Sequence, residues 1–587
     1  MGSLMPKKEK KEAPASTTPS IFSILGPYRL MVAGLILLAI AANVLTLALP
    51  KLISNGIDAY VRGSNDLSAL VIEFSLFSFG IFFFTYLQSI MQTYASEKVA
   101  RDMRAKIVNK ISHQGYRFIE DRNPSKLLTN ITSDIDSIKM FVAQVIVSLV
   151  SSGVIIIGAA IILLTIDWRL ALAVLTIIPV IGGTFFVILG QVRTLFMQSR
   201  EVIDWLNRVI SESIMGSALI RVLNSENIEH EKFSGANQRA RDLGISILQL
   251  FSFMIPIITF VANGGALIVV ALGGYYVVND SMTIGSFAAF MSYIAILIFP
   301  ILIIGFMSNL IAQATASYTR IWEVLEAPDE KDAGTITEPL KGKIQIKNVT
   351  VMYGEKPALK DVSLTILPHT KTAIIGPTAA GKTQLLNVAT GLTIPQQGEV
   401  EYDGKKLEEY ERASFYPQIG LVFQDSVLFN TTVRENVAFS TTVTDESLQK
   451  AIDTAELSDF MHRLPNGLNT VVSERGTSLS GGQKQRIMLA RALALDPKIL
   501  FLDDFTARVD ARTEKKILSN IEKNYPGLTL VSITQKIAPV EHYDQIILLM
   551  EGEVLARGTH KELMETSPEY VQIYDSQRST STYELRS

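Results

Sequence analysis

The chain divides near residue 309 into a first half of long apolar runs and a second half of short apolar runs among charged residues. Six runs in the first half are each close to the roughly 20 residues that cross a bilayer as a helix. They occupy residues 30–49, 70–91, 141–165, 170–190, 255–278 and 284–308. Runs such as VIIIGAAIILLTI are apolar on every helical face, which argues against helices of a water-soluble core. We therefore expect six membrane spans.

The basic residues predict how the spans are oriented. Lysines lie in the N-terminal tail from Lys7 to Lys11, and a basic segment from Lys98 to Lys126 joins the second and third spans. Because such residues mark the cytosolic side, both termini should be cytosolic. The connections at 96–139 and 191–244 are long, with apolar residues at helical spacing, so their helices should project well beyond the lipid.

Polar residues within the spans admit two interpretations. Amide side chains occur at Gln88, Gln92, Gln144 and Asn263. They could line a solvated cavity and contact substrate, or they could form hydrogen bonds between helices. The sequence leaves both open.

The second half contains a phosphate-binding loop, which begins after the strand-like run TAII and ends where a helical run starts. It reads Gly376, Pro377, Thr378, Ala379, Ala380, Gly381, Lys382 and Thr383, with Gln384 next. In such loops backbone amides surround the phosphates, the lysine reaches the β and γ oxygens, and the hydroxyl coordinates Mg²⁺. This motif predicts binding of ATP with Mg²⁺.

Further motifs follow in a consistent order. Gln424 ends the run IGLVFQ, and LSGGQ, with Ser480, Gly481, Gly482 and Gln483, opens a helix that could present its N-terminus to phosphate. The buried-strand pattern ILFL then ends at Asp503 and Asp504. A carboxylate at such a strand end suits Mg²⁺, and a second one suits the orientation of water for hydrolysis.

Together, Tyr353, GPTAAGKT, Gln424, LSGGQ, FLDD and Asp510 behind six spans resemble the exporter-type half-transporters of the ABC transporter superfamily. The resemblance implies a membrane all-α domain of six helices followed by an α/β P-loop nucleotide-binding domain. It implies these divisions: a disordered cytosolic tail at 1–19, the transmembrane domain at 20–325, a linker at 326–341, the nucleotide domain at 342–577 and a tail at 578–587. Residues 118–138 and 211–226 resemble the family's two coupling-helix regions.

The resemblance also implies residue roles and a second subunit. Tyr353 would stack on adenine, Gln424 would sense the γ-phosphate and Mg²⁺, and Asp503 would support Mg²⁺ together with Thr383. Ser480, with Gly481, Gly482 and Gln483, would reach the ATP held by the partner, and Asp510 would lie in the loop that joins the two sites. The partner would be another half-transporter.

Two residues depart from the family pattern at one site. Asp504 stands where the family has glutamate, and Gln535 stands where it has histidine. Removal of one methylene withdraws a carboxylate by about 1.5 Å, and an error of about 1 Å can cost 10²-fold in rate. Glutamine has no titratable imidazole. We therefore expect this chain to be the degenerate-site subunit of a bacterial heterodimer, with an active homodimer as the alternative.

Smaller departures change this picture less. Ala379 and Ala380 replace the commoner Gly-Ser pair, but the lysine and hydroxyl needed for ATP remain. Arg508 is added to the loop before Asp510, where it could form an interface salt bridge or be solvated.

Composition argues against nucleic-acid binding, thiol catalysis and a zinc site. The net charge of −3 offers no basic face for nucleic acid, zero cysteines exclude a thiol nucleophile, and six histidines lack the spacing of a zinc motif. We expect a multi-pass protein of the bacterial inner (plasma) membrane that moves amphipathic drugs, lipids or peptides. The same motifs would also fit an exporter-fold importer or an ATP-gated channel or regulator, and the transported substrate does not follow from the sequence.

Overall fold

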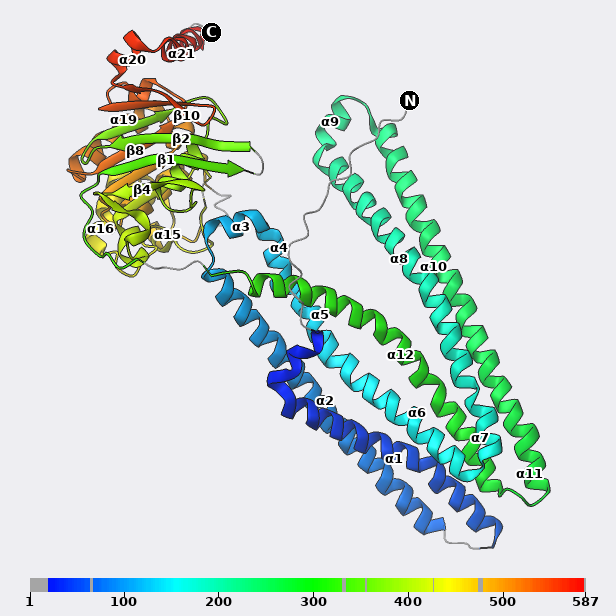
Figure 1. Cartoon of the computed structure of the whole chain (residues 1–587). Helices are drawn as coiled ribbons and strands as arrows, with labels where there is room; N and C mark the ends of the chain where they lie inside the picture. The colour runs from blue at the N-terminus through cyan, green and yellow to red at the C-terminus, as the bar shows by residue number, and fades with distance from the viewer. Residues whose placement is uncertain are drawn as a thin grey trace. The chain divides into compact units, whose positions relative to one another are not determined.

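A computed structural model of the chain describes residues 20–63, 67–329, 334–353, 356–425, 427–472 and 479–584. The expected tail at 1–19 lies outside these residues. The chain forms two compact units, of which the first contains Met1–His113 and Arg122–Pro328 and the second contains Gln114–Asp121 and Asp329–Ser587. Figure 1 shows the helices of the first unit and the sheets of the second.

The first unit is helical. Its helices are α1 (Arg29–Val61), α2 (Leu67–Ser112), α3 (Tyr116–Arg122, most of which groups with the second unit), α4 (Pro124–Thr129), α5 (Ile135–Met140), α6 (Ile146–Ile166), α7 (Trp168–Leu175), α8 (Ile177–Met215), α9 (Ser217–Val222), α10 (Glu226–Ile268), α11 (Gly274–Val278) and α12 (Ile284–Leu325). A 3₁₀ segment, Ile21–Tyr28, precedes α1, and π-helical turns occupy Asn130–Asp134, Phe141–Val145 and Val269–Gly273.

The expectation of six spans is confirmed. Among the described residues, six helical stretches of 41 to 53 residues are long and apolar enough to cross a membrane. A bilayer needs only about 20 residues, so each stretch can extend beyond the hydrocarbon layer. They are Ile21–Val61, Ser68–Ser112, Pro124–Ile166, Trp168–Met215, Glu226–Val278 and Ile284–Leu325.

Apolar packing and a few buried polar contacts hold these helices together. The fully buried Tyr293 of α12 donates a 2.7 Å hydrogen bond to the carbonyl of Leu47 in α1. Asn43 of α1 donates to Ser151 of α6 over 2.9 Å, and Gln92 of α2 donates to the carbonyl of Ala143. For Gln92 the interhelical interpretation is therefore the one that the structure favours.

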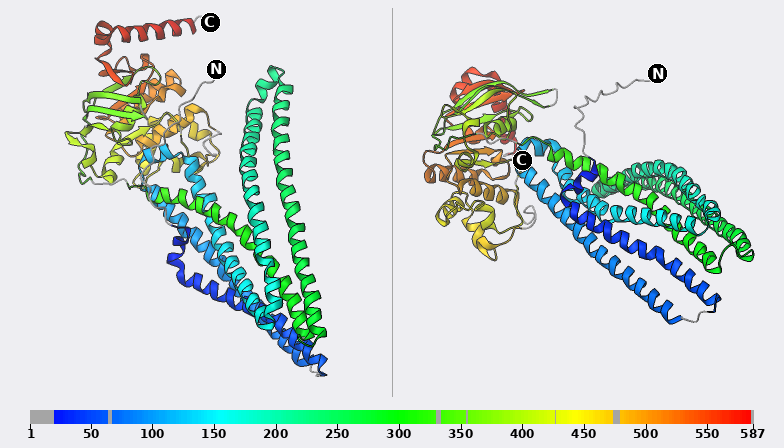
Figure 2. Two further views of the ribbon diagram at one scale, coloured as in Figure 1. Left: turned by 45° about the vertical axis from the view of Figure 1, so that its right-hand side comes forward. Right: turned by 60° about the horizontal axis from the view of Figure 1, so that its bottom comes forward.

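Helices α8 and α10 pack against each other along their length and carry α9 at one end, as all views agree (Figure 2). Most of the apolar side chains of α9 and its flanks are exposed. Met215 is 85% exposed and Val222 is 82% exposed. This tip buries little apolar surface within its own unit.

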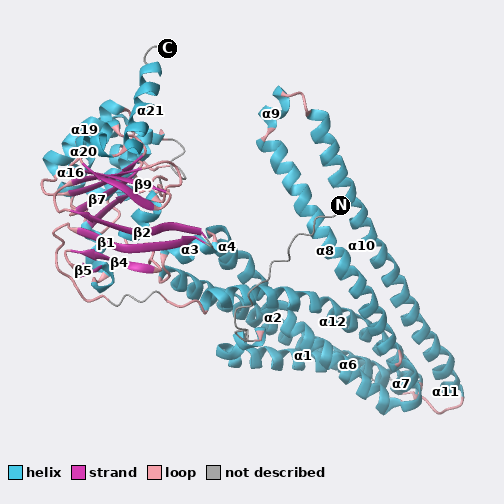
Figure 3. Ribbon diagram, turned by 45° about the horizontal axis from the view of Figure 1, so that its top comes forward, coloured by secondary structure: helices cyan, strands magenta, loops and turns pink. Residues whose placement is uncertain are grey.

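The strands lie in the second unit (Figure 3). They are β1 (Ile344–Tyr353), β2 (Lys356–Ile366), β3 (Lys371–Ile375), β4 (Gln397–Tyr402), β5 (Lys405–Lys406), β6 (Ile419–Val422), β7 (Ile499–Asp503), β8 (Thr529–Thr534), β9 (Gln545–Met550) and β10 (Glu553–Gly558). One sheet has the order β2-β1-β4-β5 and is antiparallel, and the other has the order β10-β9-β3-β8-β7-β6.

Helices surround these sheets. They are α13 (Lys382–Ala389), α14 (Arg412–Phe415), α15 (Val433–Val437), α16 (Asp445–Thr454), α17 (Ser458–Arg463), α18 (Gly481–Leu493), α19 (Ala511–Asn524), α20 (His560–Thr566) and α21 (Pro568–Glu584). Helix α21 runs through residue 578, where the sequence suggested that a C-terminal tail begins.

The parallel strands of the larger sheet explain where polar residues gather. Strands β3, β8 and β7 are buried and apolar, as expected for strands covered on both faces. Their register pairs Ile375 with Thr534 and Asp503 with Ile533. Their carboxyl ends therefore meet at one edge, where Gly376, Asp504 and Gln535 follow the three strands.

Candidate nucleotide-binding site

Close backbone contacts shape the loop between β3 and α13. A Cβ atom added to Gly376 would lie 2.1 Å from the carbonyl oxygen of Leu549. Gly381 has φ +97°, and a Cβ there would lie 2.6 Å from the carbonyl oxygen of Ala358. Both positions require glycine, because no side chain fits so close to backbone.

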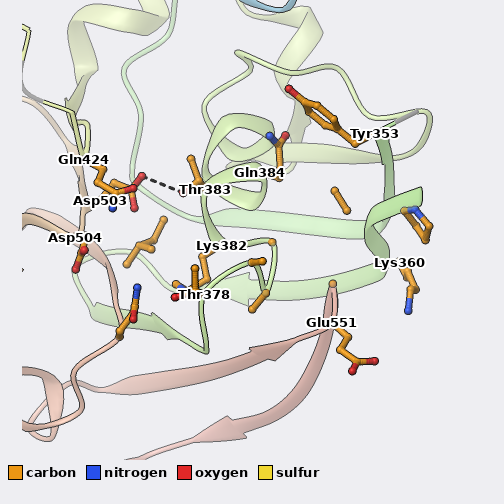
Figure 4. A pocket seen from close by; sticks show the side chains of 18 of the residues that line it. Tyr353, Lys360, Thr378, Lys382, Thr383, Gln384, Gln424, Asp503, Asp504 and Glu551 are labelled. Carbon is orange, nitrogen blue, oxygen red and sulfur yellow. Dashed lines mark hydrogen bonds between the residues drawn. The ribbon is translucent and has the colours of Figure 1, made fainter. Parts of the chain in front are cut away.

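The loop brings a cation, a hydroxyl and a carboxylate together. The Lys382 ammonium donates to the carbonyls of Gly376 and Pro377, each over 2.8 Å. The Thr383 hydroxyl donates to Oδ2 of Asp503 over 3.3 Å, a contact drawn as a dashed line in Figure 4. Helix α13 begins at Lys382, so its unpaired N-terminal amides face the same space.

Burial controls protonation here. It raises the pKa of Asp503 to about 6, an effect that the charge of Asp504 increases and that Thr383 and Lys382 oppose. It also holds the pKa of Lys382 below its usual value, although both aspartates counteract this shift. A ligand that brings positive charge to Asp503 would favour its ionised form.

These groups line a cavity of about 880 Å³. Of the residues predicted for this site, the cavity contains Tyr353, Thr378, Ala379, Ala380, Gly381, Lys382, Thr383, Gln384, Gln424, Asp503, Asp504 and Gln535. They come from β1, the loop before α13 and the first turn of that helix, the segment after β6, and the ends of β7 and β8. Sequence positions as distant as 353 and 535 therefore share one pocket.

The two departures from the family pattern lie in this cavity. Asp504 has left-handed backbone (φ 45°), a conformation that aspartate tolerates better than most residues. Its amide donates to the carbonyl of Ile533 over 2.8 Å, which fixes it beside β8. Gln535, at the end of β8, is exposed and lines the cavity. The short carboxylate and the neutral amide thus border the same space as the loop lysine.

The LSGGQ segment and Asp510 lie outside the cavity. Ser480 caps α18: its hydroxyl accepts from the amide of Gln483 over 3.3 Å, and Gln483 Oε1 accepts from the amide of Ser480 over 2.8 Å. Arg508 packs against this turn, and a Cβ on Gly482 would lie 2.7 Å from its carbonyl oxygen. Asp510 caps α19 through the amide of Thr513, which helps hold its pKa below the usual value.

Some residues that line or support the cavity are not indicated by any sequence motif. Lys360, Glu551 and Gly552 line the cavity, although they belong to no motif. Gln577 of α21 donates to the carbonyl of Gln535 over 2.7 Å and accepts from the amide of Ile537 over 3.0 Å. These two hydrogen bonds hold the backbone on both sides of Lys536, directly after Gln535. A polar residue in a C-terminal helix gives no sequence signal for such a role.

The donor set suits Mg²⁺ better than a softer metal. Thr383, Gln424 and Asp503 provide oxygen atoms, which Mg²⁺ prefers, and it usually completes its shell with water and phosphate. In the described part of the chain, no cluster of three or more His, Cys or acidic residues could hold a metal by itself. The ion, when bound, would neutralise phosphate charge.

Comparisons with protein families match both units. The family described as the ABC transporter transmembrane region matches residues 32–301, and the family described as ABC transporter matches residues 359–507.

Known proteins match over most of the chain. A probable multidrug resistance ABC transporter ATP-binding/permease protein of Bacillus subtilis (strain 168), YheI, is 30% identical over 560 residues, or 92% of this chain and 94% of that protein. An ATP-dependent lipid A-core flippase of Syntrophus aciditrophicus (strain SB) is 27% identical over 497 residues, or 84% of this chain and 83% of that protein.

The fold also matches a solved structure, that of a bacterial Atm1-family ABC exporter with ATP bound. The TM-score is 0.75 at 22% sequence identity, with 94% of this chain and 99% of the other covered. At this identity the likeness concerns the fold: six apolar helices and an α/β nucleotide domain.

Proposed function

The chain belongs to the ABC transporter family, with an exporter-type transmembrane region ahead of an ABC ATP-binding domain, and from this premise we propose that it is one subunit of a heterodimeric exporter. It is an ATP-hydrolysing transporter and a multi-pass membrane protein. In the proposal it lies in the bacterial inner membrane, with both termini and the nucleotide unit in the cytoplasm. It binds Mg-ATP at a degenerate site and hydrolyses it poorly.

One observation carries the proposal: binding groups and altered catalytic groups border the same cavity. Lys382, Thr383 and Asp503, whose chemistry suits phosphate and Mg²⁺, line this cavity. At the catalytic positions, Asp504 reaches less far than glutamate and Gln535 cannot titrate. Binding without efficient turnover is what this combination of groups favours.

The LSGGQ segment supports the second half of the proposal. Ser480, Gly481 and Gly482 lie outside the cavity of their own chain. At the start of α18 they offer amides and a hydroxyl, which suit the phosphates of ATP on a facing subunit. The partner would supply glutamate and histidine, so most hydrolysis would occur at the composite site on the partner.

The names of two relatives support an amphipathic substrate. One is called a lipid A-core flippase and the other a probable multidrug resistance transporter. We infer that this exporter moves amphipathic molecules such as lipids, drugs or peptides. ATP binding would close the nucleotide domains and turn the substrate cavity outward, and hydrolysis would reset it.

The test measures ATP binding and ATP hydrolysis by the full chain in lipid, first alone and then with a co-expressed half-transporter from its own operon. We expect binding without brisk turnover alone, and turnover once the partner is present. Changing the partner's catalytic glutamate to glutamine should abolish that turnover. Brisk hydrolysis by the chain alone would instead identify an active homodimer in which Asp504 is an adequate base.

A pair of variants separates the two halves of this subunit. In the assembled pair, Ser480→Asp should lower turnover by at least tenfold, because its charge repels the partner's ATP, whereas Asp504→Asn should change turnover by less than about twofold. Aspartate still caps a helix, so α18 should remain folded. Equal losses in both variants would argue against an asymmetric pair.

A further inference from the structure

Two opposite charges lie on facing helices at one end of the helical unit, next to apolar surface. Lys51 belongs to α1 and Glu73 belongs to α2. These antiparallel helices lie close enough that a Cβ on Gly56 would meet Leu70 and one on Gly80 would meet Leu45. Interpolation between these contacts puts Lys51 within one helical turn of the level of Glu73.

Both residues line a cavity of about 1080 Å³ among α1, α2 and α6, which we call the α1–α2–α6 cavity. Helix α1 contributes Leu47, Lys51 and Asn55, whose spacing of four residues puts them on one face. Helix α2 contributes Glu73 and Phe77, and α6 contributes Ile162. The cavity thus has a charged region continuous with an apolar wall.

Both charges lie near the ends of the apolar runs of their helices. The apolar run of the first span ends at residue 49 and that of the second begins at residue 70, so Lys51 and Glu73 lie at the edge of the hydrocarbon layer. In the part of the chain that the structure describes, neither the Lys51 ammonium nor the Glu73 carboxylate has an ion-pair partner. Both side chains are exposed in this chain, so their charged ends are accessible to a ligand.

We propose that the α1–α2–α6 cavity binds a zwitterionic phospholipid from the leaflet on the side of the connection between α1 and α2. The Lys51 ammonium pairs with the lipid phosphate, and the Glu73 carboxylate pairs with the ammonium of the headgroup. Leu47, Phe77 and Ile162 contact an acyl chain. The two charges of the headgroup complement the two charges of the cavity, and the bilayer supplies this lipid at the right depth.

The inference requires a chain that spans the membrane, but it does not depend on which ATP site hydrolyses. Its test is therefore a binding measurement without ATP. Native mass spectrometry of the delipidated full chain in detergent would count phosphatidylethanolamine or phosphatidylglycerol molecules retained per chain over a lipid titration. A separate ATP-binding assay on the same samples would report on the proposed function.

We expect Lys51→Ala to weaken the binding of both lipids by about tenfold, because both carry a phosphate. Glu73→Ala should weaken phosphatidylethanolamine by a similar factor but leave phosphatidylglycerol bound at least as tightly. The control is Phe79→Ala, also on α2, where the side chain is 66% exposed and lies outside the cavity. It should retain both lipids like the wild type.

The charge-swapped double variant Lys51→Glu/Glu73→Lys tests whether the single variants lose lipid because they lose a charge or because they misfold. If the site is a charge pair, the swap should recover at least half of the phosphatidylethanolamine affinity lost in the single variants. Equal retention of phosphatidylethanolamine by wild type, Lys51→Ala and Glu73→Ala would overturn the proposal and indicate non-specific annular lipid only. Removal of both lipids' dependence on Lys51 and Glu73, so that every variant retains phosphatidylethanolamine and phosphatidylglycerol like the wild type, would also overturn the proposal.

Discussion

The backbone at Ala379 carries strain inside the phosphate-binding loop. Ala379 has φ 64°, in the left-handed region, and its side chain is exposed. That conformation costs a residue with a Cβ about 1–2 kcal/mol. Glycine would remove this cost, but it would add about 0.5–1 kcal/mol of chain entropy to be lost on folding.

We therefore expect Ala379→Gly to stabilise the folded chain by about 0.5–1 kcal/mol. Thermal melting of the purified chain, followed with and without ATP, measures the change. Ala380→Gly is the matched control, because Ala380 is buried and has no positive φ, so its loss of packing should lower the melting temperature. A lower melting temperature for both variants would contradict the strain argument.

Glu514 of α19 should make stability depend on pH. Burial raises its pKa to about 7 from an ordinary 4.5, although Lys536 opposes the shift, and its Oε1 has no hydrogen-bond partner within the described residues. Because the pKa of Glu514 is higher in the folded chain than in the unfolded chain, folding favours the protonated carboxyl. The contribution of Glu514 to the free energy of unfolding is therefore complete below pH 4.5 and is lost as pH rises through 7.

Glu514→Gln removes this titration while keeping the shape of the side chain. Its melting temperature should exceed that of the wild type at pH 8 and match it at pH 4. Glu522→Gln, on the same helix, where the side chain is half-exposed and pairs with Lys371, controls for the loss of a negative charge from α19. A constant difference between Glu514→Gln and wild type across this range would contradict the assignment.

At the residue scale, the sequence predicts groups that motifs fix and misses those that tertiary contacts fix. Lys382, Thr383 and Asp503 were predictable because phosphate and Mg²⁺ demand these residue types at this spacing. Gln577 was not, because it reaches Gln535 from 42 positions away through main-chain atoms, which any sequence provides. The strain at Ala379 likewise depends on φ, which residue type alone did not reveal.

At the scale of elements, helix α21 connects the C-terminal end of the described chain to the nucleotide cavity. Gln577 bonds the carbonyl of Gln535 and the amide of Ile537 with one side chain. Gln577→Ala should leave that amide without its partner and speed its hydrogen exchange by about tenfold. Hydrogen exchange followed by mass spectrometry measures this directly.

Gln572→Ala, at an exposed position of the same helix, is the control for a general loosening of α21. It should leave exchange around Ile537 unchanged. If both variants accelerate exchange equally, the helix acts as a whole and Gln577 has no special role.

The extent and regularity of the elements were only partly predictable. Hydropathy located all six spans, because a bilayer imposes an apolar length, but it could not locate where helices continue in water. The π-helical turns at Asn130–Asp134 and Val269–Gly273 were missed as well. One extra residue in a turn leaves composition and periodicity almost unaltered.

At the scale of the whole molecule, the exposed tip formed by α9 and its flanks is a surface that suits contact with a second subunit. Exposed clusters of large apolar side chains commonly mark interaction surfaces. Val222→Asp should therefore reduce co-purification with the partner and lower the turnover of the pair by at least tenfold, while ATP binding by this chain stays unchanged.

Ser217→Asp adds the same charge to α9 at an exposed polar position and serves as the control. It should assemble and turn over ATP like the wild type. Normal assembly of Val222→Asp would show that the tip is solvated in the complex, contrary to the expectation.

Domain organisation was predictable in outline, because lipid and water select different compositions for the two halves. The grouping of Gln114–Asp121 with the second unit was not, because this segment lies between two spans and more than 200 positions before Asp329, where that unit resumes. Contacts across such separations depend on the folded arrangement.

The long paired helices α8 and α10 have a mechanical consequence. Helix α8 has 39 residues, which at about 1.5 Å each make an arm of about 58 Å. A rotation of about 5° at its far end would therefore sweep α9 through about 5 Å, a distance close to one turn of helix. A slight rearrangement among membrane helices is amplified into a displacement large enough to engage or release another protein, as a lever does.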